Sequence, residues 1–214
     1  MQEFIDHTNL RADARRDEII KLCQEAREYG FKAVCVNPYY VELASLELAA
    51  SGVEIATVIG FPLGQNTTAV KVFELKEALR SGATEIDAVI NIAAVKDGDW
   101  EYYQEELHQL KKAACGVQIK LILETGLLTS KEIAEASRLA VECGYDFLKT
   151  STGYQAVGAT IEAVEIMKAA GPENLQIKAA GGIRDLASCR KFIEAGATRI
   201  GTSSAVKIMS ELQN

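Results

Sequence analysis

Charged residues lie within several apolar segments of the chain, where a buried charge is costly. Asp87 lies in EIDAVIN, Lys149 in DFLKTSTG and Lys178 in QIKAAGG, while Lys120 and Glu124 share a fourth segment, KLILET. A charge in a buried strand costs several kcal/mol unless it is paired. An internal salt-bridge network would explain any one of these residues. Two lysines and an aspartate together favour a chemical role.

The spacing of Lys149 and Lys178 predicts that they meet. Alternate residues of a strand share a face, so each lysine points inward if its strand turns that face to the interior. Two ammonium groups about 4 Å apart repel by roughly 4 kcal/mol at an effective dielectric constant of about 20, enough to keep one of them neutral near pH 7. A neutral amine can add to a carbonyl group, and Asp87 would then pass protons directly or through one water. This pattern predicts Schiff-base chemistry.

Eight short β-rich segments alternate with helical stretches and would position these residues. The predicted strands are residues 4–8, 33–37, 55–60, 85–91, 118–125, 146–152, 176–182 and 199–204. The predicted helices include residues 15–29, 68–81, 100–115, 130–143, 160–170 and 186–195. Regular alternation implies parallel strands with right-handed crossovers. We therefore predict an α/β fold, a single (β/α)8 TIM barrel over residues 1–214, with an open doubly wound sheet as the alternative.

The ends of the predicted helices carry sequence signals. Glycines that can adopt a positive φ follow four of them, at Gly30, Gly82, Gly144 and Gly196. Thr129, Ser130, Thr160 and Asp185 stand where N-caps are expected.

The last two predicted strands end in segments suited to hold an anion. Gly181 and Gly182 in KAAGGIR let backbone N–H groups approach a phosphate, and Ser203 and Ser204 in GTSSA add hydroxyl donors. The loops after strands seven and eight hold phosphate in many barrels. A Gly-Gly pair alone would equally fit a tight turn, so its position in the fold carries the prediction.

Composition narrows the function classes. A net charge of −7 argues against sequence-independent binding to nucleic acid or to an anionic membrane. The chain has no apolar run of membrane-spanning length, and its first residues lack the layout of a signal peptide. Five dispersed cysteines without a CxxC pair fit reduced thiols, so we expect a cytoplasmic protein. Two histidines disfavour a zinc site, and we expect no metal.

The motifs also resemble those of the deoxyribose-phosphate aldolases. The resembling segments run in family order from Ile5 to Ser204: IDHTNL, CVNP, TVIGFPLG, EIDAVINI, LILET, DFLKTSTG, KAAGGIR and AGATRIGTSS. The resemblance implies that Lys149 forms the Schiff base, Lys178 perturbs it and Asp87 relays protons. It also implies a phosphate site at Gly153, Gly181, Gly182, Arg184, Ser203 and Ser204, and a pocket lined by Asp6, Thr8 and Cys35.

The implied reaction is the reversible cleavage of 2-deoxy-D-ribose 5-phosphate to acetaldehyde and D-glyceraldehyde 3-phosphate. The implied partners are this phosphorylated sugar and the aldehydes, with no cofactor. A homo-oligomer, either a dimer or a tetramer, is left open.

Two other functions remain as alternatives. A phosphate-binding barrel such as a sugar-phosphate isomerase would explain the phosphate loops but not the two buried lysines. A catalytically silent sugar-phosphate-binding protein would be favoured if Asp87, Lys149 or Lys178 were missing, and all three are present. His7 is set aside as a catalytic partner of Asp6, because neighbouring residues of a strand face opposite sides.

Overall fold

The computed structural model describes residues 1–213, so Asn214, the last residue of the predicted domain, lies outside the described residues. Eight parallel strands pair in chain order, and β8 also pairs with β1, so the sheet closes. The strands are β1 (Ile5–Asn9), β2 (Ala33–Val36), β3 (Glu54–Ile59), β4 (Glu85–Val89), β5 (Gln118–Ile122), β6 (Phe147–Lys149), β7 (Gln176–Ala180) and β8 (Arg199–Thr202). The predicted barrel is confirmed.

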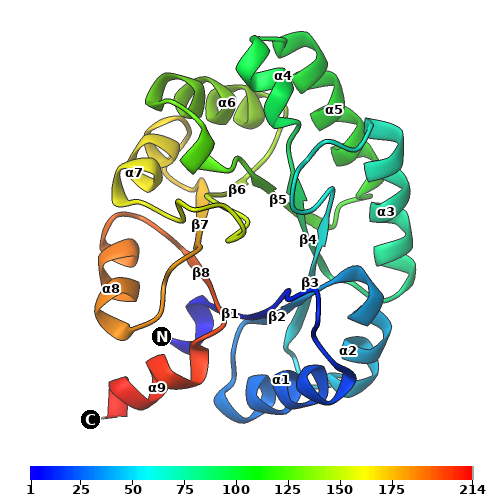
Figure 1. Cartoon of the computed structure of the whole chain (residues 1–214), viewed down its shortest axis with the longest axis vertical. Helices are drawn as coiled ribbons and strands as arrows, with labels where there is room; N and C mark the ends of the chain where they lie inside the picture. Colours follow the sequence, from blue (N-terminus) through cyan, green and yellow to red (C-terminus); the bar gives the residue numbers. More distant parts are fainter. Residues whose placement is uncertain (214) are drawn as a thin grey trace.

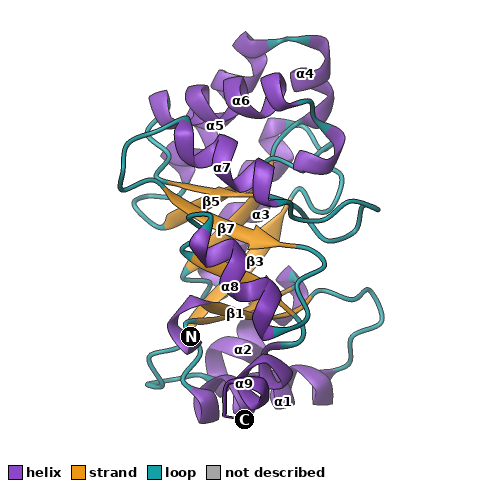
Figure 2. Cartoon of the chain, turned by 90° about the vertical axis from the view of Figure 1, so that its left-hand side faces the viewer, coloured by secondary structure: helices purple, strands orange, loops and turns teal. Residues whose placement is uncertain are grey.

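Helices surround the barrel on its outside (Figure 1). They are α1 (Arg16–Tyr29), α2 (Val41–Glu47), α3 (Thr68–Arg80), α4 (Ile92–Asp97), α5 (Trp100–Ala113), α6 (Ser130–Glu142), α7 (Ile161–Ala169), α8 (Leu186–Glu194) and α9 (Ala205–Gln213). Short 3-10 turns are η1 (Gln2–Phe4), η2 (Pro38–Tyr40) and η3 (Thr125–Leu127). Figure 2 shows loops projecting at both ends of the strands. No helix within residues 1–213 is long and apolar enough to cross a bilayer.

The helix ends largely follow their sequence signals. The Thr129 side chain accepts a hydrogen bond from the N–H of Glu132, whose carboxylate accepts one from the N–H of Thr129, so a capping box starts α6. The predicted N-caps Thr160 and Asp185 start α7 and α8, and each side chain accepts a hydrogen bond from the N–H three residues further on. Ser130 is instead the first residue of α6, because Thr129 takes the cap. The four predicted helix-end glycines all have positive φ.

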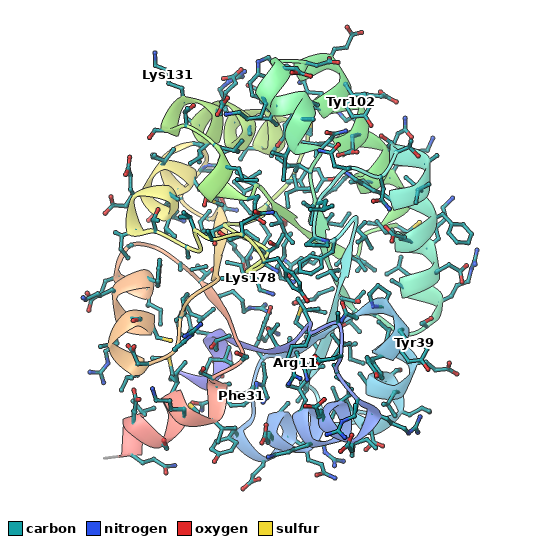
Figure 3. The ribbon with its side chains drawn as sticks, in the orientation of Figure 1. Arg11, Phe31, Tyr39, Tyr102, Lys131 and Lys178 are labelled. Carbon is teal, nitrogen blue, oxygen red and sulfur yellow. The ribbon has the colours of Figure 1, made fainter. Side chains whose placement is uncertain are left out.

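Successive side chains of each strand point alternately outward, toward the helices, and inward, toward the barrel axis. Ile86 of β4 packs in the main apolar core, between the barrel and the helices, in one cluster with Leu75 of α3 and Leu107 of α5. Its neighbour Asp87 faces the barrel axis instead. Figure 3 places Lys178 of β7 in the middle of the ring of strands. Apolar side chains thus hold the helices on the barrel, while the strands carry charged side chains inside it.

Some predicted boundaries differ from the structure. The predicted strand at residues 118–125 overran β5 by three residues, and the one at 146–152 overran β6 by as many. Glu124 has a left-handed backbone with a φ of 54°, which ends the extended conformation after β5. Three helices, α2, α4 and α9, were not among the predicted stretches; each has nine residues or fewer.

Candidate active site

Asp87 lies at the centre of the charged side chains inside the barrel. Its Oδ2 atom is 2.8 Å from Nζ of Lys149 and 2.8 Å from Nζ of Lys178. Its Oδ1 atom is 3.0 Å from Nζ of Lys120. All four side chains are buried. Adjacent strands β6 and β7 place Lys149 directly beside Lys178 in the register, so the predicted meeting of the two lysines is observed.

The same interior holds further ion pairs toward the amino ends of the strands. Lys178 also pairs with Asp6, whose other oxygen is 2.6 Å from Nη1 of Arg199. Glu85 lies 3.1 Å from Arg199 and 2.7 Å from Lys120. We call this set the charged network; it comprises Asp6, Glu85, Asp87, Lys120, Lys149, Lys178 and Arg199. Its four cations face three carboxylates.

The charged network sets the protonation of its members. Burial alone would raise the pKa of Asp87, but attraction to Lys120, Lys149 and Lys178 holds it well below its ordinary value of 3.8. Burial alone would lower the pKa of Lys178, but attraction to Asp6 and Asp87 raises it above its ordinary value of 10.5. Lys178 is therefore an ammonium group and Asp87 a carboxylate at neutral pH. For Lys178, attraction to these two carboxylates thus outweighs the repulsion between lysines that the sequence predicts.

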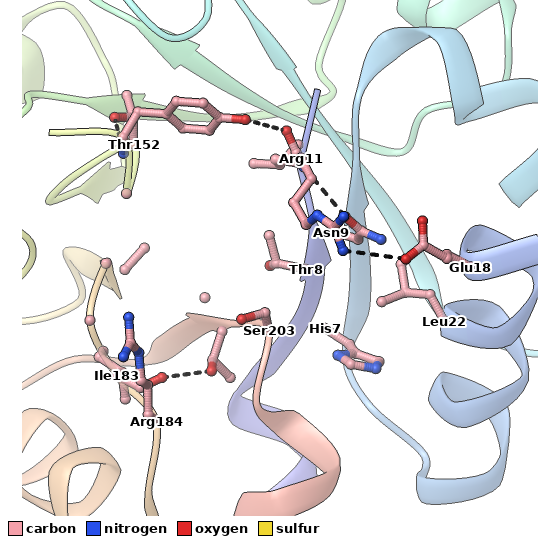
Figure 4. A pocket seen from close by; sticks show the side chains of 18 of the residues that line it. His7, Thr8, Asn9, Arg11, Glu18, Leu22, Thr152, Ile183, Arg184 and Ser203 are labelled. Carbon is pink, nitrogen blue, oxygen red and sulfur yellow. Dashed lines mark hydrogen bonds and ion pairs between the residues drawn. The ribbon is translucent and has the colours of Figure 1, made fainter. Parts of the chain in front are cut away.

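A cavity of about 970 Å³ opens at the carboxyl ends of the strands (Figure 4). Lys149 is one of the residues that line it. Active sites of this fold form at this end. Thr152 lies on one side of the cavity, and Thr8 and Leu22 lie on the other. Asp87 and Lys178 do not line the cavity; they lie buried against Lys149.

The predicted phosphate residues gather on the β6 to β8 side of this cavity. It is lined by Gly153, Gly181, Gly182, Arg184 and Ser203. Gly181 and Gly182 have φ values of 97° and 84°, which side chains rarely tolerate. Ser203 is exposed two residues before α9, whose N-terminal end can attract an anion.

Other predicted pocket residues lie in different places. Thr8 lines the cavity, and its hydroxyl donates to the backbone oxygen of Asp6. Asp6 and Cys35 are fully buried and are not among the lining residues. Ser204 is not among them either, and its N–H donates to the hydroxyl of Thr202. Within the described residues, Asp6 therefore contacts Lys178 rather than the open cavity.

Sequence reasoning gave no site role to Glu124 or Thr152. Glu124 is fully buried after β5, and its carboxylate accepts hydrogen bonds from both the N–H and the hydroxyl of Thr152. Burial raises the pKa of Glu124. Its left-handed backbone is uncommon outside glycine and often marks a functional site. The signal in the sequence was the charge at the end of the apolar run LILE.

His7 is paired with a carboxylate of α1. His7 points away from the barrel axis, and its Nε2 atom is 2.7 Å from Glu25 of α1. Burial lowers the pKa of His7. Among the described residues, no three His, Cys, Asp or Glu side chains cluster as metal ligands would.

Comparison with known proteins extends this geometry. The family model for DeoC/LacD family aldolases matches residues 2–210. A deoxyribose-phosphate aldolase of Thermococcus gammatolerans is 52% identical, over 99% of this chain and 96% of that protein. One of Staphylococcus haemolyticus is 49% identical, again over 99% and 96% of the two chains. A solved structure described as a tetrameric deoxyribose phosphate aldolase of Aeropyrum pernix superposes with a TM-score of 0.92 at 34% identity, covering 100% of this chain and 91% of that one.

Proposed function

Because the chain belongs to the DeoC/LacD aldolase family, we propose that it is a deoxyribose-phosphate aldolase that works through a Schiff base on Lys149. Its substrate is 2-deoxy-D-ribose 5-phosphate, and its products are acetaldehyde and D-glyceraldehyde 3-phosphate. The reaction is reversible and uses no metal or other cofactor.

The different surroundings of the two lysines carry this proposal. Lys149 lines the cavity and forms an ion pair with Asp87, and its charge also acts on the buried carboxylate of Glu124. Lys178 lies beneath it, between Asp6 and Asp87. An attack on a carbonyl carbon needs a free amine within reach of the substrate, and of these two lysines Lys149 is the one that lines the cavity.

The proposed reaction proceeds through a covalent intermediate on Lys149. The amine of Lys149 adds to C1 of the open-chain sugar, and loss of water gives the iminium ion. The bond between C2 and C3 breaks, its electron pair moves toward the iminium nitrogen, and the C3 hydroxyl loses its proton. D-glyceraldehyde 3-phosphate leaves. Protonation of the enamine at C2 and hydrolysis then release acetaldehyde and the free lysine.

The proton transfers fall to the neighbours of Lys149. Oδ2 of Asp87 lies 2.8 Å from both lysine nitrogens, so it can accept a proton from one side and receive a hydrogen bond from the other. Lys178, held as an ammonium group, adds to the attraction of Lys120 and Lys149 that holds the pKa of this carboxylate down.

The phosphate lies at Gly153, Gly181, Gly182, Arg184, Ser203 and Ser204 in this proposal. Five of these six residues line the same cavity as Lys149. An extended five-carbon sugar phosphate would place its C5 end at these glycines and its C1 end at the lysine. Thr8 lines the opposite wall, while Asp6 and Cys35 support the site from below.

Cellular location and oligomeric state are two further parts of the proposal. We propose a cytoplasmic enzyme, since its five cysteines are unpaired. We also propose a homo-oligomer, because Tyr39, Leu46 and Phe73 are large apolar side chains exposed on the outer helices and turns.

Incubation of the purified protein with 2-deoxyribose 5-phosphate tests the function. Acetaldehyde and glyceraldehyde 3-phosphate should form in equal amounts, and Lys149→Leu should release neither. Conversion of the substrate to an isomeric sugar phosphate without acetaldehyde would contradict the proposal and favour an isomerase.

A further inference from the structure

Glu124 is a buried residue that joins the end of β5 to the segment that carries Lys149. On one side of it, the N–H of Leu123 donates to the backbone oxygen of Lys149 at 3.0 Å. On the other side, the N–H of Thr125 donates to the backbone oxygen of Thr150 at 2.9 Å. Burial raises the pKa of Glu124, and attraction to Lys149 opposes that rise. The backbone around Glu124 and its charge thus both lie beside Lys149.

The side chain of Glu124 binds the residue at the end of this segment, Thr152. Its carboxylate accepts hydrogen bonds from the N–H of Thr152, at 3.2 and 3.3 Å, and from its hydroxyl. That hydroxyl accepts a hydrogen bond from the N–H of Tyr154 at 3.1 Å. Between them lies Gly153, which has a φ of 86° and lines the cavity, as Thr152 does (Figure 4). Glu124 therefore holds the turn that carries Gly153.

The same segment is fixed to β7 on its other side. The hydroxyl of Thr150 donates to the backbone oxygen of Ala180 and accepts from the N–H of Ala180, both at 3.1 Å. Ala180 precedes Gly181, which belongs to the proposed phosphate site. We call residues 149–153 the linking segment. It runs from Lys149 to Gly153 and is held by Glu124 on one side and by the end of β7 on the other.

The backbone of Glu124 indicates that its carboxylate has a purpose at this position. Its φ of 54° and ψ of 58° are left-handed, a conformation that costs free energy for any residue with a side chain and persists where the surroundings hold it. Glycine would adopt this backbone without strain, but it would leave the buried N–H of Thr152 without its acceptor. A position that glycine would suit better thus carries the carboxylate that binds Thr152.

We propose, on the basis of the proposed function, that Glu124 is a positioning residue that keeps the amine of Lys149 and the phosphate site at a fixed separation by holding the linking segment. The substrate carries its carbonyl at C1 and its phosphate on C5, so both contacts form together only when that separation matches the sugar. Binding of the phosphate then places C1 at the amine. Glu124 is not among the residues that line the cavity, so it acts through the linking segment.

Two substrates that differ only in the phosphate measure this coupling. We would determine kcat/KM for 2-deoxyribose 5-phosphate and for unphosphorylated 2-deoxyribose. Glu124→Ala should lower the ratio of the two values about tenfold or more, because the bound phosphate no longer places C1 correctly. Glu124→Gln keeps an oxygen that can accept the hydrogen bonds of Thr152, so it should retain most of the ratio. Labelling of Lys149 by acetaldehyde and borohydride should change little, because acetaldehyde carries no phosphate.

Glu132→Ala is the matched control. Glu132 also accepts hydrogen bonds from the N–H and the hydroxyl of a threonine, Thr129, but it lies at the start of α6 and does not line the cavity. Its replacement should lower stability and leave the ratio unchanged. If Glu124→Ala does not fold, as judged by circular dichroism, Glu124→Gly suits the left-handed backbone, lacks the carboxylate and carries the same expectation.

An unchanged ratio in the folded Glu124 variants, including an equal fall in kcat/KM for both sugars, would overturn the positioning role and leave the proposed function intact. An equally lowered ratio in Glu132→Ala would overturn it too, because loss of any similar contact would then have the same effect. Failure of the unmodified protein to cleave either sugar would instead overturn the proposed function.

Discussion

Lys149 and Lys178 are the same residue type in adjacent strands, and their surroundings separate their roles. Lys178 is enclosed by two carboxylates, and attraction to them raises its pKa despite burial. Lys149 shares one of those carboxylates and faces the cavity. The lysine with an open approach from the cavity is the one suited to attack a carbonyl. The division of labour thus depends on Asp6, which binds one lysine and not the other.

Replacement of Lys178 by Met tests its supporting role. The substitution removes a buried positive charge from beside the amine of Lys149, and a nearby like charge is what favours a neutral amine. Activity at neutral pH should fall by about a hundredfold or more, and the pH of half-maximal activity should move upward. Acetaldehyde should still label Lys149. An unchanged pH profile would contradict a role for Lys178 in setting the charge of the site.

Ser203→Asp tests the position of the phosphate. A carboxylate at this lining position would repel the phosphate, which takes no part in bond cleavage, so KM for 2-deoxyribose 5-phosphate should rise about tenfold or more with a smaller change in kcat. Unphosphorylated 2-deoxyribose serves as the control substrate and should react no worse than before. If instead only the unphosphorylated sugar reacted worse, the phosphate would have to lie elsewhere.

At the scale of the elements, the loops after β5, β6 and β7 fit together as one unit. Gly158 lies so close to Gly181 that an added Cβ atom would come within 2.3 Å of the Gly181 oxygen. Gly181 lines the cavity. Tyr154, which lies in the same loop as Gly158, lines it as well. Packing of backbone on backbone therefore couples the proposed phosphate site to the loop that carries Tyr154.

Gly158→Ala should separate these loops. Overpacking of this kind costs about 1–3 kcal/mol, and we expect a lower melting temperature together with a higher KM for the phosphorylated sugar. Gly116→Ala is the control, because an added Cβ atom there meets nothing within 4 Å. It should lower stability slightly through its positive φ and leave KM unchanged. A Gly158→Ala variant with normal KM would show that the close contact does not shape the site.

The elements also show what the sequence could and could not predict. The barrel, the core of each strand and the meeting of Lys149 with Lys178 followed from alternation and periodicity. The carboxyl ends of β5 and β6 could not be predicted. After β5, the β-rich sequence pattern continues past Glu124, although the backbone of Glu124 is left-handed. The hydrogen bond from the Tyr154 hydroxyl to the backbone oxygen of Leu10 could not be predicted either. Tyr154 and Leu10 are 144 residues apart in the sequence, and no local pattern predicts a contact between them.

At the scale of the whole molecule, the charged network ties all but two of the strands together through the barrel interior. Asp87 has a depressed pKa, so its contribution to stability is present above its ordinary value of 3.8 and is lost as pH falls through the depressed value. Lys178 has a raised pKa, so its contribution is present below its ordinary value of 10.5 and is lost as pH rises through the raised value. The stabilisation is therefore fully present between these two ordinary values.

Asp87→Asn should remove much of this stabilisation. Three buried lysines would lose a partner, and breaking a buried pair costs about 3–5 kcal/mol, so the free energy of unfolding in urea should fall by that amount near neutral pH. Asp13→Asn is the control, because Asp13 forms an exposed pair with Arg11 and should change stability little. Equal stability of Asp87→Asn and the unmodified protein would contradict the network.

Metal independence is a further expectation for the whole enzyme. A lysine Schiff base stabilises the electron pair from the broken bond without a Lewis acid, so activity should survive an excess of EDTA. Loss of activity on chelation, with recovery after addition of zinc, would contradict the covalent mechanism.

The location of the covalent intermediate tests the central claim most directly. The unmodified protein is incubated with acetaldehyde and borohydride, digested, and mapped by peptide mass spectrometry. We predict one ethyl group per chain, on Lys149, and none in Lys149→Leu. An ethyl group on Lys178 would reverse the roles of the two lysines. Cleavage of 2-deoxyribose 5-phosphate without any trapped adduct would contradict the Schiff-base account altogether.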